Sequence, residues 1–346
     1  MKTFYDRRLG EPVEDRQFGG GSLRFLYERP LGRLFLRLVI RPFFSRMVAY
    51  YYRSPLSRRK IKAFIQQYGV DLKIFEGEDY RSFNDFFIRK KKPEFLPDFS
   101  VDKDQADSFF YSPADSKLML YDISDGLDFS AQGRSARSIK GSGKGTGRVS
   151  PVSFLDQEPG LATDCVEDSE GKTERREGTV RIKGHDYRLE DLVGDREEAA
   201  RFAGGTCLVF RLSVDDYHRY MHVGTGPVIK RKRIDGKLHT VSDFSKQFPI
   251  FIENQRCYEV VESDGLGRYL QMEVGALLVG KIVNREEDRA VLGREKGYFE
   301  FGGSTIIVLL EKGRMFLDEG LTDHIREGME CRVKYGERIG RLCSID

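Results

Sequence analysis

Hydrophobic and polar positions follow two different patterns in the two parts of the chain. Between residues 31 and 67, leucine, phenylalanine and tyrosine alternate with arginine at helical spacing. Because proline breaks a helix, this segment is predicted to form two helices interrupted near Pro42 and Pro55. Residues 80–93, which read YRSFNDFFIRKKKP, predict a short helix followed by a basic turn.

The pattern changes to that of a β protein further along the chain. FFYSPADSKLMLYD, at residues 109–122, opens a section of short strands. After residue 179, apolar runs of four to eight residues are separated by Gly, Asp and Asn. We therefore predict an α+β protein, with a helical region at 1–75 and a mostly β catalytic domain at 76–346.

An insertion is expected within the β domain, between about 122 and 179. Its composition shifts to Gly, Ser, Arg and acidic residues, and little periodicity remains. It contains KGSGKGTGR, which is similar to a phosphate-binding loop. The match fails because Ser138 replaces the leading glycine and Gly145 replaces the hydroxyl residue that would bind magnesium. A flexible insertion without a nucleotide site is the better interpretation.

Composition narrows the class of protein. An apolar fraction of 39% excludes global disorder, and 33% charged residues indicate a soluble or peripherally bound protein. The start of the chain is charged where a secretory signal needs an apolar core, and no stretch approaches the ~18–20 apolar residues that span a bilayer. The five cysteines are scattered without a CxxC pair, which favours a reducing compartment over disulfides or a zinc site.

Charge is informative locally rather than overall. The net charge of +3 indicates no particular partner, and no nucleic-acid partner is expected. Arg33, Arg37 and Arg41, however, share a helical stretch with many apolar residues. Such a helix suits an anionic membrane surface, although an amphipathic helix packed on the protein core gives the same pattern.

Three residue types could form a nucleophile, a base and an orienting group. His218 and His222 lie in VDDYHRYMH, just after an apolar strand, and could act as general bases. Asp115, in SPADSK, could orient a histidine, and Ser304 could be the nucleophile. Each of these residues also has an ordinary structural interpretation, and Asp115 by itself would be a turn residue.

The surroundings of Ser304 point to a special reaction. In FEFGGSTIIVLLEKG, Gly302 and Gly303 lack Cβ atoms, so the backbone can be strained and the Gly303 carbonyl is open to attack. The hydroxyl of Ser304 could attack the peptide bond that precedes it. The resulting ester could eliminate to dehydroalanine, which hydrolyses to an N-terminal pyruvoyl group. The chain would then make its own cofactor.

The sequence resembles the phosphatidylserine decarboxylase proenzymes of the subtype with a Gly-Gly-Ser-Thr processing site. The resemblance extends from about residue 75 to the C-terminus. It rests on six segments in the order of the family: SFNDFFIRKKKP, SPADSK, IKGHDYRLEDLV, VDDYHRYMH, VGALLVGKI and FEFGGSTIIVLLEKG.

The resemblance implies cleavage between Gly303 and Ser304, which gives a β chain of residues 1–303 and an α chain of residues 304–346. It implies a pyruvoyl group derived from Ser304, which forms a Schiff base with the amine of phosphatidylserine and accepts the electrons released with CO2. Asp115 matches the charge-relay aspartate of the family. No metal is implied. A peripheral place on the cytoplasmic face of a bacterial membrane and a homodimer are also implied.

One motif departs from the family pattern. The family often reads DYHRxH, with histidines three residues apart, whereas here the spacing is four and Met221 takes the second position. His218 aligns with the first histidine without a shift, so we expect it to be indispensable. His222 remains a candidate for the relay.

Two alternatives belong to other classes. One is a serine hydrolase that uses Ser304, Asp115 and either histidine on an external ester, although the chain lacks a GxSxG elbow around Ser304. The other is a non-catalytic membrane-binding protein that uses the basic helices. The first alternative predicts an intact chain that reacts with serine-directed phosphonates, and the second predicts vesicle binding without cleavage.

Overall fold

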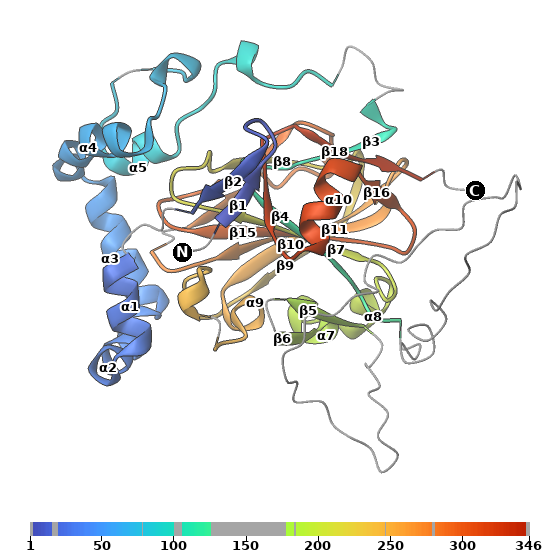
Figure 1. The fold of residues 1–346 in the computed structure, drawn as a ribbon, viewed down its shortest axis with the longest axis horizontal. Coiled ribbons are helices and arrows are strands. Elements are labelled where there is room, and N and C mark those ends of the chain that lie inside the picture. The colour runs from blue at the N-terminus through green and yellow to red at the C-terminus, as the bar shows by residue number, and fades with distance from the viewer. Residues whose placement is uncertain are drawn as a thin grey trace, which may run out of the picture.

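The structure is a computed structural model that describes residues 3–15, 20–77, 79–99, 106–125, 178–182, 185–245, 247–278 and 281–343. Most of them form a body of β-sheets, and a group of helices lies along one side of this body (Figure 1). The predicted α+β class with a mostly β domain is confirmed. The insertion expected at 122–179 and its KGSGKGTGR motif lie almost entirely outside the described residues.

One ten-stranded sheet forms the centre of the body. Its neighbouring strands are antiparallel, except for β1 and β17, which are parallel. In spatial order the strands are β13 (Arg289–Ala290), β9 (Gly226–Ile234), β10 (Arg256–Ser263), β11 (Gly267–Gly275), β15 (Ser304–Leu310), β7 (Thr206–Leu212), β4 (Ser116–Asp122), β17 (Glu330–Val333), β1 (Thr3–Asp6) and β2 (Glu11–Glu14).

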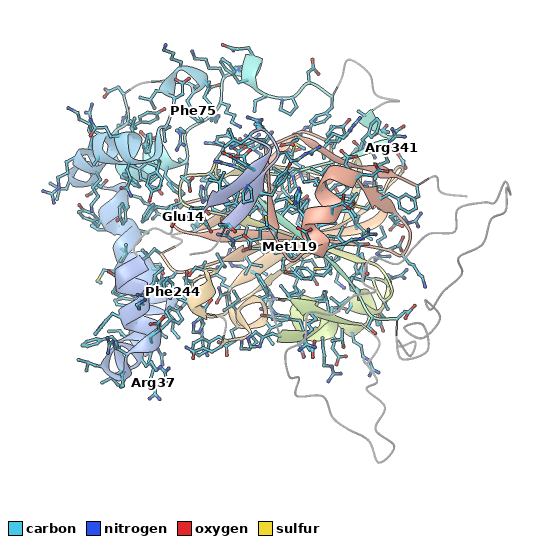
Figure 2. The ribbon with its side chains drawn as sticks, in the orientation of Figure 1. Glu14, Arg37, Phe75, Met119, Phe244 and Arg341 are labelled. Carbon is cyan, nitrogen blue, oxygen red and sulfur yellow. The ribbon has the colours of Figure 1, made fainter. Side chains whose placement is uncertain are left out.

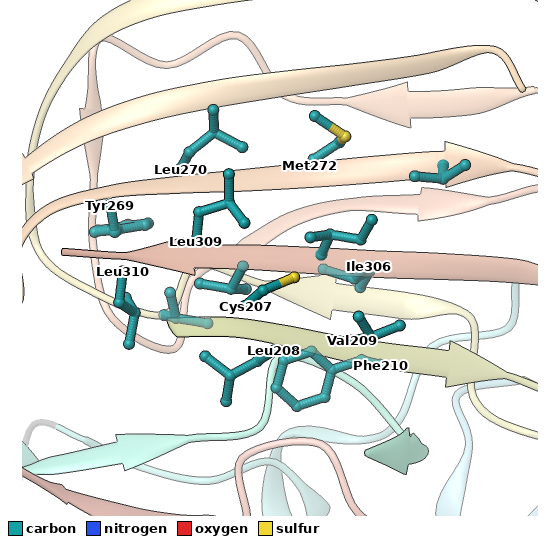
Figure 3. Close-up of a cluster of buried hydrophobic side chains, with 14 of the residues drawn as sticks. Cys207, Leu208, Val209, Phe210, Tyr269, Leu270, Met272, Ile306, Leu309 and Leu310 are labelled. Atoms are coloured by element: carbon teal, nitrogen blue, oxygen red, sulfur yellow. The ribbon is translucent and has the colours of Figure 1, made fainter. Parts of the chain in front are cut away.

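The central strand β15 is the most protected element. All seven of its residues are buried, which explains why it reads as a continuous apolar run after Ser304 and Thr305 rather than as an alternating pattern. Continuous pairing with β11 on one side and β7 on the other fixes the register of β15 and with it the position of Ser304. Figure 3 shows Ile306 and Leu309 of β15 among side chains of the neighbouring strands, which include Leu208, Phe210, Leu270 and Met272.

Smaller elements cover the central sheet. Three small sheets consist of β12 (Ile282–Asn284), β14 (Glu295–Phe299) and β8 (Arg219–Met221); of β16 (Met315–Leu317), β18 (Arg338–Leu342) and β3 (Phe109–Tyr111); and of β5 (Thr179–Ile182) and β6 (His185–Arg188). The helices of this part are α7 (Leu189–Val193), α8 (Arg196–Ala200), α9 (Ile250–Glu253) and α10 (Glu319–Arg326), with a 3-10 turn at Asp243–Ser245.

The first residues of the chain correct one prediction. A helical region was expected from residue 1, but residues 3–14 form β1 and β2 at the edge of the central sheet. Phe4 is buried there and pairs with Glu330 of β17. Pairing with a distant strand decides this structure, and local sequence carries little signal for such pairing.

Helices fill most of the next fifty residues. They are α1 (Gly20–Glu28), α2 (Pro30–Val39), α3 (Pro42–Arg53) and α4 (Arg59–Tyr68), followed by α5 (Phe83–Phe87) and 3-10 turns at Pro55–Arg58, Leu72–Ile74 and Pro93–Phe95. The interruptions near Pro42 and Pro55 are confirmed. They separate three helices rather than two, because each proline occupies the first turn of the element that follows it.

The helices contact the body through a small apolar cluster. Tyr27, Leu36 and Ile40 are buried and pack with Phe244 and Phe248 of the body. Figure 2 shows Phe244 on the side of the body that faces the helices, while Arg37 lies at the far end of the helical group.

Within the described part of the chain, no helix is both long and apolar enough to cross a membrane. The same residues contain no cluster of His, Cys, Asp and Glu side chains that could bind a metal ion. The four cysteines in the described ranges are free.

Candidate active site

The Gly-Gly-Ser-Thr segment forms the turn from β14 into β15. Gly302 has a φ of 143°, which side chains rarely tolerate, so glycine is required there. A Cβ atom added at Gly303 would meet only Val241, at 3.7 Å, so little crowds the Cα of this residue. The segment is held from outside, because the Phe301 amide donates to Oδ1 of Asn84 over 3.1 Å. Asn84 belongs to the SFNDFF motif, for which sequence reasoning had found no role.

Ser304 is the first residue of β15, where it pairs with Gly275 of β11 and Leu212 of β7. It is fully buried, and its hydroxyl has no hydrogen-bond partner in the described structure. Leaving a buried hydroxyl unpaired costs about 1–3 kcal/mol, so a functional explanation is called for. Gly275 has no side chain, and Leu238 packs so closely against it that an added Cβ would lie 3.1 Å from the leucine.

The strand register places His218 and Ser304 on the same side of the central sheet. Side chains alternate along a strand, so Gln271 and Gly275 share one face of β11. Nε2 of Gln271 donates to the Met221 carbonyl in β8, which shows that this face looks toward β8. Ser304 pairs with Gly275 and presents its hydroxyl on this face, and His218 immediately precedes β8.

His218 is prepared to accept a proton. It is fully buried, and Nδ1 lies 2.9 Å from the Asp216 carbonyl. A carbonyl can only accept, so Nδ1 carries the hydrogen and Nε2 has the free lone pair. Nε2 has no hydrogen-bond partner among the described residues. Burial lowers the pKa of His218 to about 4, so the ring is neutral at pH 7.

Two contacts fix His218 relative to the turn at Gly302 and Gly303. The Phe299 amide donates to the His218 carbonyl over 2.9 Å, and Phe299 ends the strand that leads into the turn. The imidazole also packs on Phe87, with ring centroids 4.2 Å apart, and Phe87 in turn packs on Phe301 at 5.2 Å. These contacts connect His218 to Phe299 and, through Phe87, to Phe301, which lies two residues before Gly303.

Asp216 is a residue that sequence reasoning missed, although it stands in the same motif as His218. Its carbonyl orients the imidazole, and its own carboxylate is anchored by Lys117 Nζ at 2.7 Å and by the Ser213 amide at 2.8 Å. Burial would raise the pKa of Asp216, but the charges of Lys117 and Lys334 outweigh burial and lower it. The orienting group of His218 is thus a backbone carbonyl held by a buried ion pair.

Asp115 has lysine partners instead of a histidine. It accepts from Lys91 Nζ at 3.3 Å, Lys334 Nζ at 3.0 Å and the Tyr335 amide at 2.9 Å. Burial would raise the pKa of Asp115, but the charges of Lys334 and Lys91 outweigh burial, so the carboxylate is ionised. Met221, which takes the place of the second family histidine, donates its amide to the Pro113 carbonyl beside this turn.

His222 lies in a different cluster. Its Nδ1 is 3.9 Å from Oε2 of Glu259, and Lys296 lies 3.7 Å from the same oxygen. Lys296 also forms a fully buried ion pair with Glu273 at 2.7 Å. Burial, together with the nearby cations, lowers the pKa of His222 to about 3. The structure gives His222 no contact with Ser304, His218 or Asp115.

A cavity of about 90 Å³ opens beside Gly303. Its polar lining residues are Asp15, Arg211, Ser213, Thr240 and Ser242. Its apolar lining includes Leu23 of α1, Leu277 and Leu278 of the VGALL segment, and also Leu212, Val214 and Val241.

Comparison with known proteins agrees with the resemblance found in the sequence. The model of the phosphatidylserine decarboxylase family matches residues 163–341. The chain is 36% identical to phosphatidylserine decarboxylase proenzyme 2 of Clostridium acetobutylicum over 98% of each chain. It is 30% identical to the phosphatidylserine decarboxylase proenzyme of Clostridium perfringens over 98% of this chain and 99% of the relative. For the Clostridium novyi proenzyme the identity is 31%, over 93% of each chain.

Proposed function

The chain belongs to the phosphatidylserine decarboxylase family, and from this premise we propose that it cuts itself between Gly303 and Ser304 and then converts phosphatidylserine to phosphatidylethanolamine and CO2. One observation carries the proposal. A buried, unpartnered hydroxyl follows two glycines on the sheet face where a neutral histidine presents a free nitrogen.

In self-cleavage, Oγ of Ser304 attacks the Gly303 carbonyl carbon. His218 Nε2 takes the hydroxyl proton and delivers it to the Ser304 nitrogen as the C–N bond breaks and an ester forms. Loss of the Ser304 Cα proton with cleavage of the Cβ–Oγ bond releases Gly303 as a carboxylate and leaves dehydroalanine. Water then converts dehydroalanine to a pyruvoyl group and ammonia.

The residues present fit a pyruvoyl group at position 304. The Ser304 hydroxyl is buried without a hydrogen-bond partner, and β15 is held in place by pairing with β11 and β7. Once formed, the group supplies an electrophilic carbonyl that takes up the substrate amine and accepts the electrons released with CO2. Replacing CO2 by hydrogen consumes one proton, and we assign its delivery to His218 Nε2.

For Asp115 we propose an electrostatic role in place of direct contact with a histidine. Its ionised carboxylate balances the ammonium groups of Lys91 and Lys334. Without this negative charge, the two lysines would disfavour a protonated His218 during cleavage. His222 is left out of the relay, because its neighbours are Glu259 and Lys296.

We further propose that α1–α3 dock the enzyme on an anionic bilayer, at the cytoplasmic face of a bacterial membrane. Large apolar side chains point to solvent there, including Leu34 at 62%, Leu38 at 58% and Phe43 at 67% exposure. Exposed arginines lie among them at positions 33, 37, 41 and 46. Apolar side chains can enter the acyl boundary while the guanidinium groups meet anionic headgroups.

The docking proposal has its own test. Replacing Leu34 and Leu38 together by serine should weaken flotation with phosphatidylserine vesicles at least tenfold and leave cleavage complete. Unchanged flotation would contradict docking through this face.

The homodimer expected from the family resemblance stays a prediction, which sedimentation velocity would check.

The catalytic proposal is tested with Ser304→Ala. The variant should remain one chain and release no CO2 from phosphatidylserine vesicles, whereas the unaltered protein should yield phosphatidylethanolamine and CO2 in equal amounts. Labelling of an intact, unaltered chain by a serine-directed phosphonate would favour the hydrolase alternative. Vesicle binding with neither cleavage nor CO2 release would favour the non-catalytic alternative.

A further inference from the structure

The cavity beside Gly303 has one wall that contains little regular structure. This wall is the segment 238–245, here named the cavity loop, and Thr240, Val241 and Ser242 from it line the cavity. Val241 is also the side chain that stands nearest to an added Cβ at Gly303. The position of the cavity loop therefore sets the shape of the space next to the reactive bond.

Part of the cavity loop is fixed by the body of the protein. Asn254 is fully buried, and its side chain accepts from the His239 amide at 2.9 Å and donates to the carbonyls of His239 and Gly275 at 2.9 and 2.8 Å. Gly275 is the residue that pairs with Ser304. Asn254 thus ties the start of the cavity loop to the strand beside the nucleophile.

The N-terminal helices fix the rest of the cavity loop. The Leu238 amide donates to the Ile40 carbonyl at the end of α2 over 2.8 Å. Tyr27 of α1, which is only 1% exposed, accepts from the Thr240 amide at 3.0 Å and lies 3.3 Å from His239 Nδ1. One buried hydroxyl therefore holds two successive residues of the cavity wall from a helix outside the central sheet.

The chemistry of the lining fits the two ends of a phospholipid. Leu23 of α1 and two leucines at 277 and 278 provide apolar surface, and the lining also carries hydroxyls, a guanidinium group and a carboxylate. Arg211 is shared with Asp15 and Glu330, so charges of both signs meet at the lining. A phosphatidylserine headgroup carries an ammonium group, a carboxylate and a phosphate, so it is anionic overall but needs both donors and acceptors.

Resting on the function proposed above, we infer that this cavity receives the serine headgroup and that Tyr27 is a positioning residue for its polar wall. The helix α1 then has two roles. Phe25 of α1 is exposed on the helical group that faces the bilayer, whereas Leu23 and Tyr27 build the cavity. Docking of the helices on the membrane thereby places the headgroup site at the lipid surface.

The test uses Tyr27→Phe, which removes the hydroxyl and keeps the ring. Intact mass should show complete cleavage. KM for a short-chain phosphatidylserine below its micelle concentration should rise about three- to tenfold, the effect of one hydrogen bond, with kcat nearly unchanged. Tyr269→Phe is the matched control, because Tyr269 is also buried and bonds one backbone carbonyl, at the far end of β11. It should leave KM unchanged.

Binding gives a readout that does not depend on turnover. Calorimetry with glycerophosphoserine on the uncut Ser304→Ala chain should show binding that Tyr27→Phe weakens by the same factor. A second variant, Thr240→Val, should also raise KM, because it removes a hydroxyl of the lining without touching the backbone amide that Tyr27 holds.

Three outcomes would overturn the inference. The first is an unchanged KM in both Tyr27→Phe and Thr240→Val. The second is a loss of activity seen only with vesicle substrates, and the third is an equal fall of kcat in Tyr27→Phe and Tyr269→Phe. Failure of the unaltered protein to release CO2 would instead refute the proposed function, so the two failures are distinguishable.

Discussion

His218 and His222 are four residues apart, and both are buried with ring nitrogens that lack hydrogen-bond partners. Burial lowers the pKa of each, to about 4 and about 3. Their neighbours differ: His218 adjoins the turn that enters β15, whereas His222 adjoins an ion-pair cluster of Glu259, Glu273 and Lys296. The comparison teaches that burial and a shifted pKa do not identify a catalytic base, and that the adjacent reactive bond does.

The largest difference is expected from the two histidines themselves. His218→Asn should slow self-cleavage about 10²- to 10⁴-fold, because it removes the proton acceptor. His222→Asn should change the rate less than threefold. Time courses of cleavage during cell-free synthesis, followed by gel electrophoresis, measure both rates. Equal effects of the two substitutions on the cleavage rate would contradict the assignment of His218 as the only base of the two.

The cluster around His222 should matter for folding instead. Lys296→Met leaves Glu273 buried without its cation and should lower the free energy of unfolding by about 3–5 kcal/mol. Adding Glu273→Leu should restore much of this stability, because a buried ion pair can be replaced by apolar side chains. Urea unfolding of the Ser304→Ala chain measures the effect. If Lys296→Met abolished cleavage without changing stability, the cluster would have a direct role in the cleavage reaction, contrary to this prediction.

The carboxylates Asp115 and Glu259 are expected to differ in the same way as the two histidines. Asp115→Asn should slow cleavage about tenfold, the equivalent of one pKa unit, since it removes the counter-charge of Lys91 and Lys334, and Lys334 acts on Asp216, which orients His218. Glu259→Gln should leave the cleavage rate within twofold. The same time courses apply, and a slower Glu259→Gln than Asp115→Asn would contradict the assignment.

The smallest expected effects concern pH. Because the pKa of His218 is lowered to about 4, the unfolded chain binds protons more readily than the folded chain between pH 6.5 and 4. Stability should therefore fall as the pH decreases through this range.

The cleavage rate should stay level from pH 8 to about 5 and decline near pH 4, in the unaltered protein and in His222→Asn alike. A decline centred near pH 6.5 would mean that His218 is not buried.

Sequence reasoning found most of the fold class and the reactive segment, because helical spacing, apolar runs and a Gly-Gly-Ser-Thr turn are local signals. It missed β1 and β2, whose pairing with β17 is a long-range contact. It also predicted that Asp115 contacts a histidine. The carboxylate of Asp115 instead accepts hydrogen bonds from Lys91 and Lys334, which are distant from it in sequence. Asn84, Asp216 and Tyr27 act through individual hydrogen bonds to residues distant in sequence or to the backbone, and such bonds leave no periodic pattern in the sequence.

The central claim is that the Gly303–Ser304 bond breaks through the chain's own chemistry, and intact-mass spectrometry of the purified protein tests it directly. From a mass of 39.8 kDa, the account predicts fragments of about 35 and about 5 kDa by chain length, the smaller one beginning with a pyruvoyl group. A single uncut chain that nevertheless decarboxylates phosphatidylserine would contradict the account.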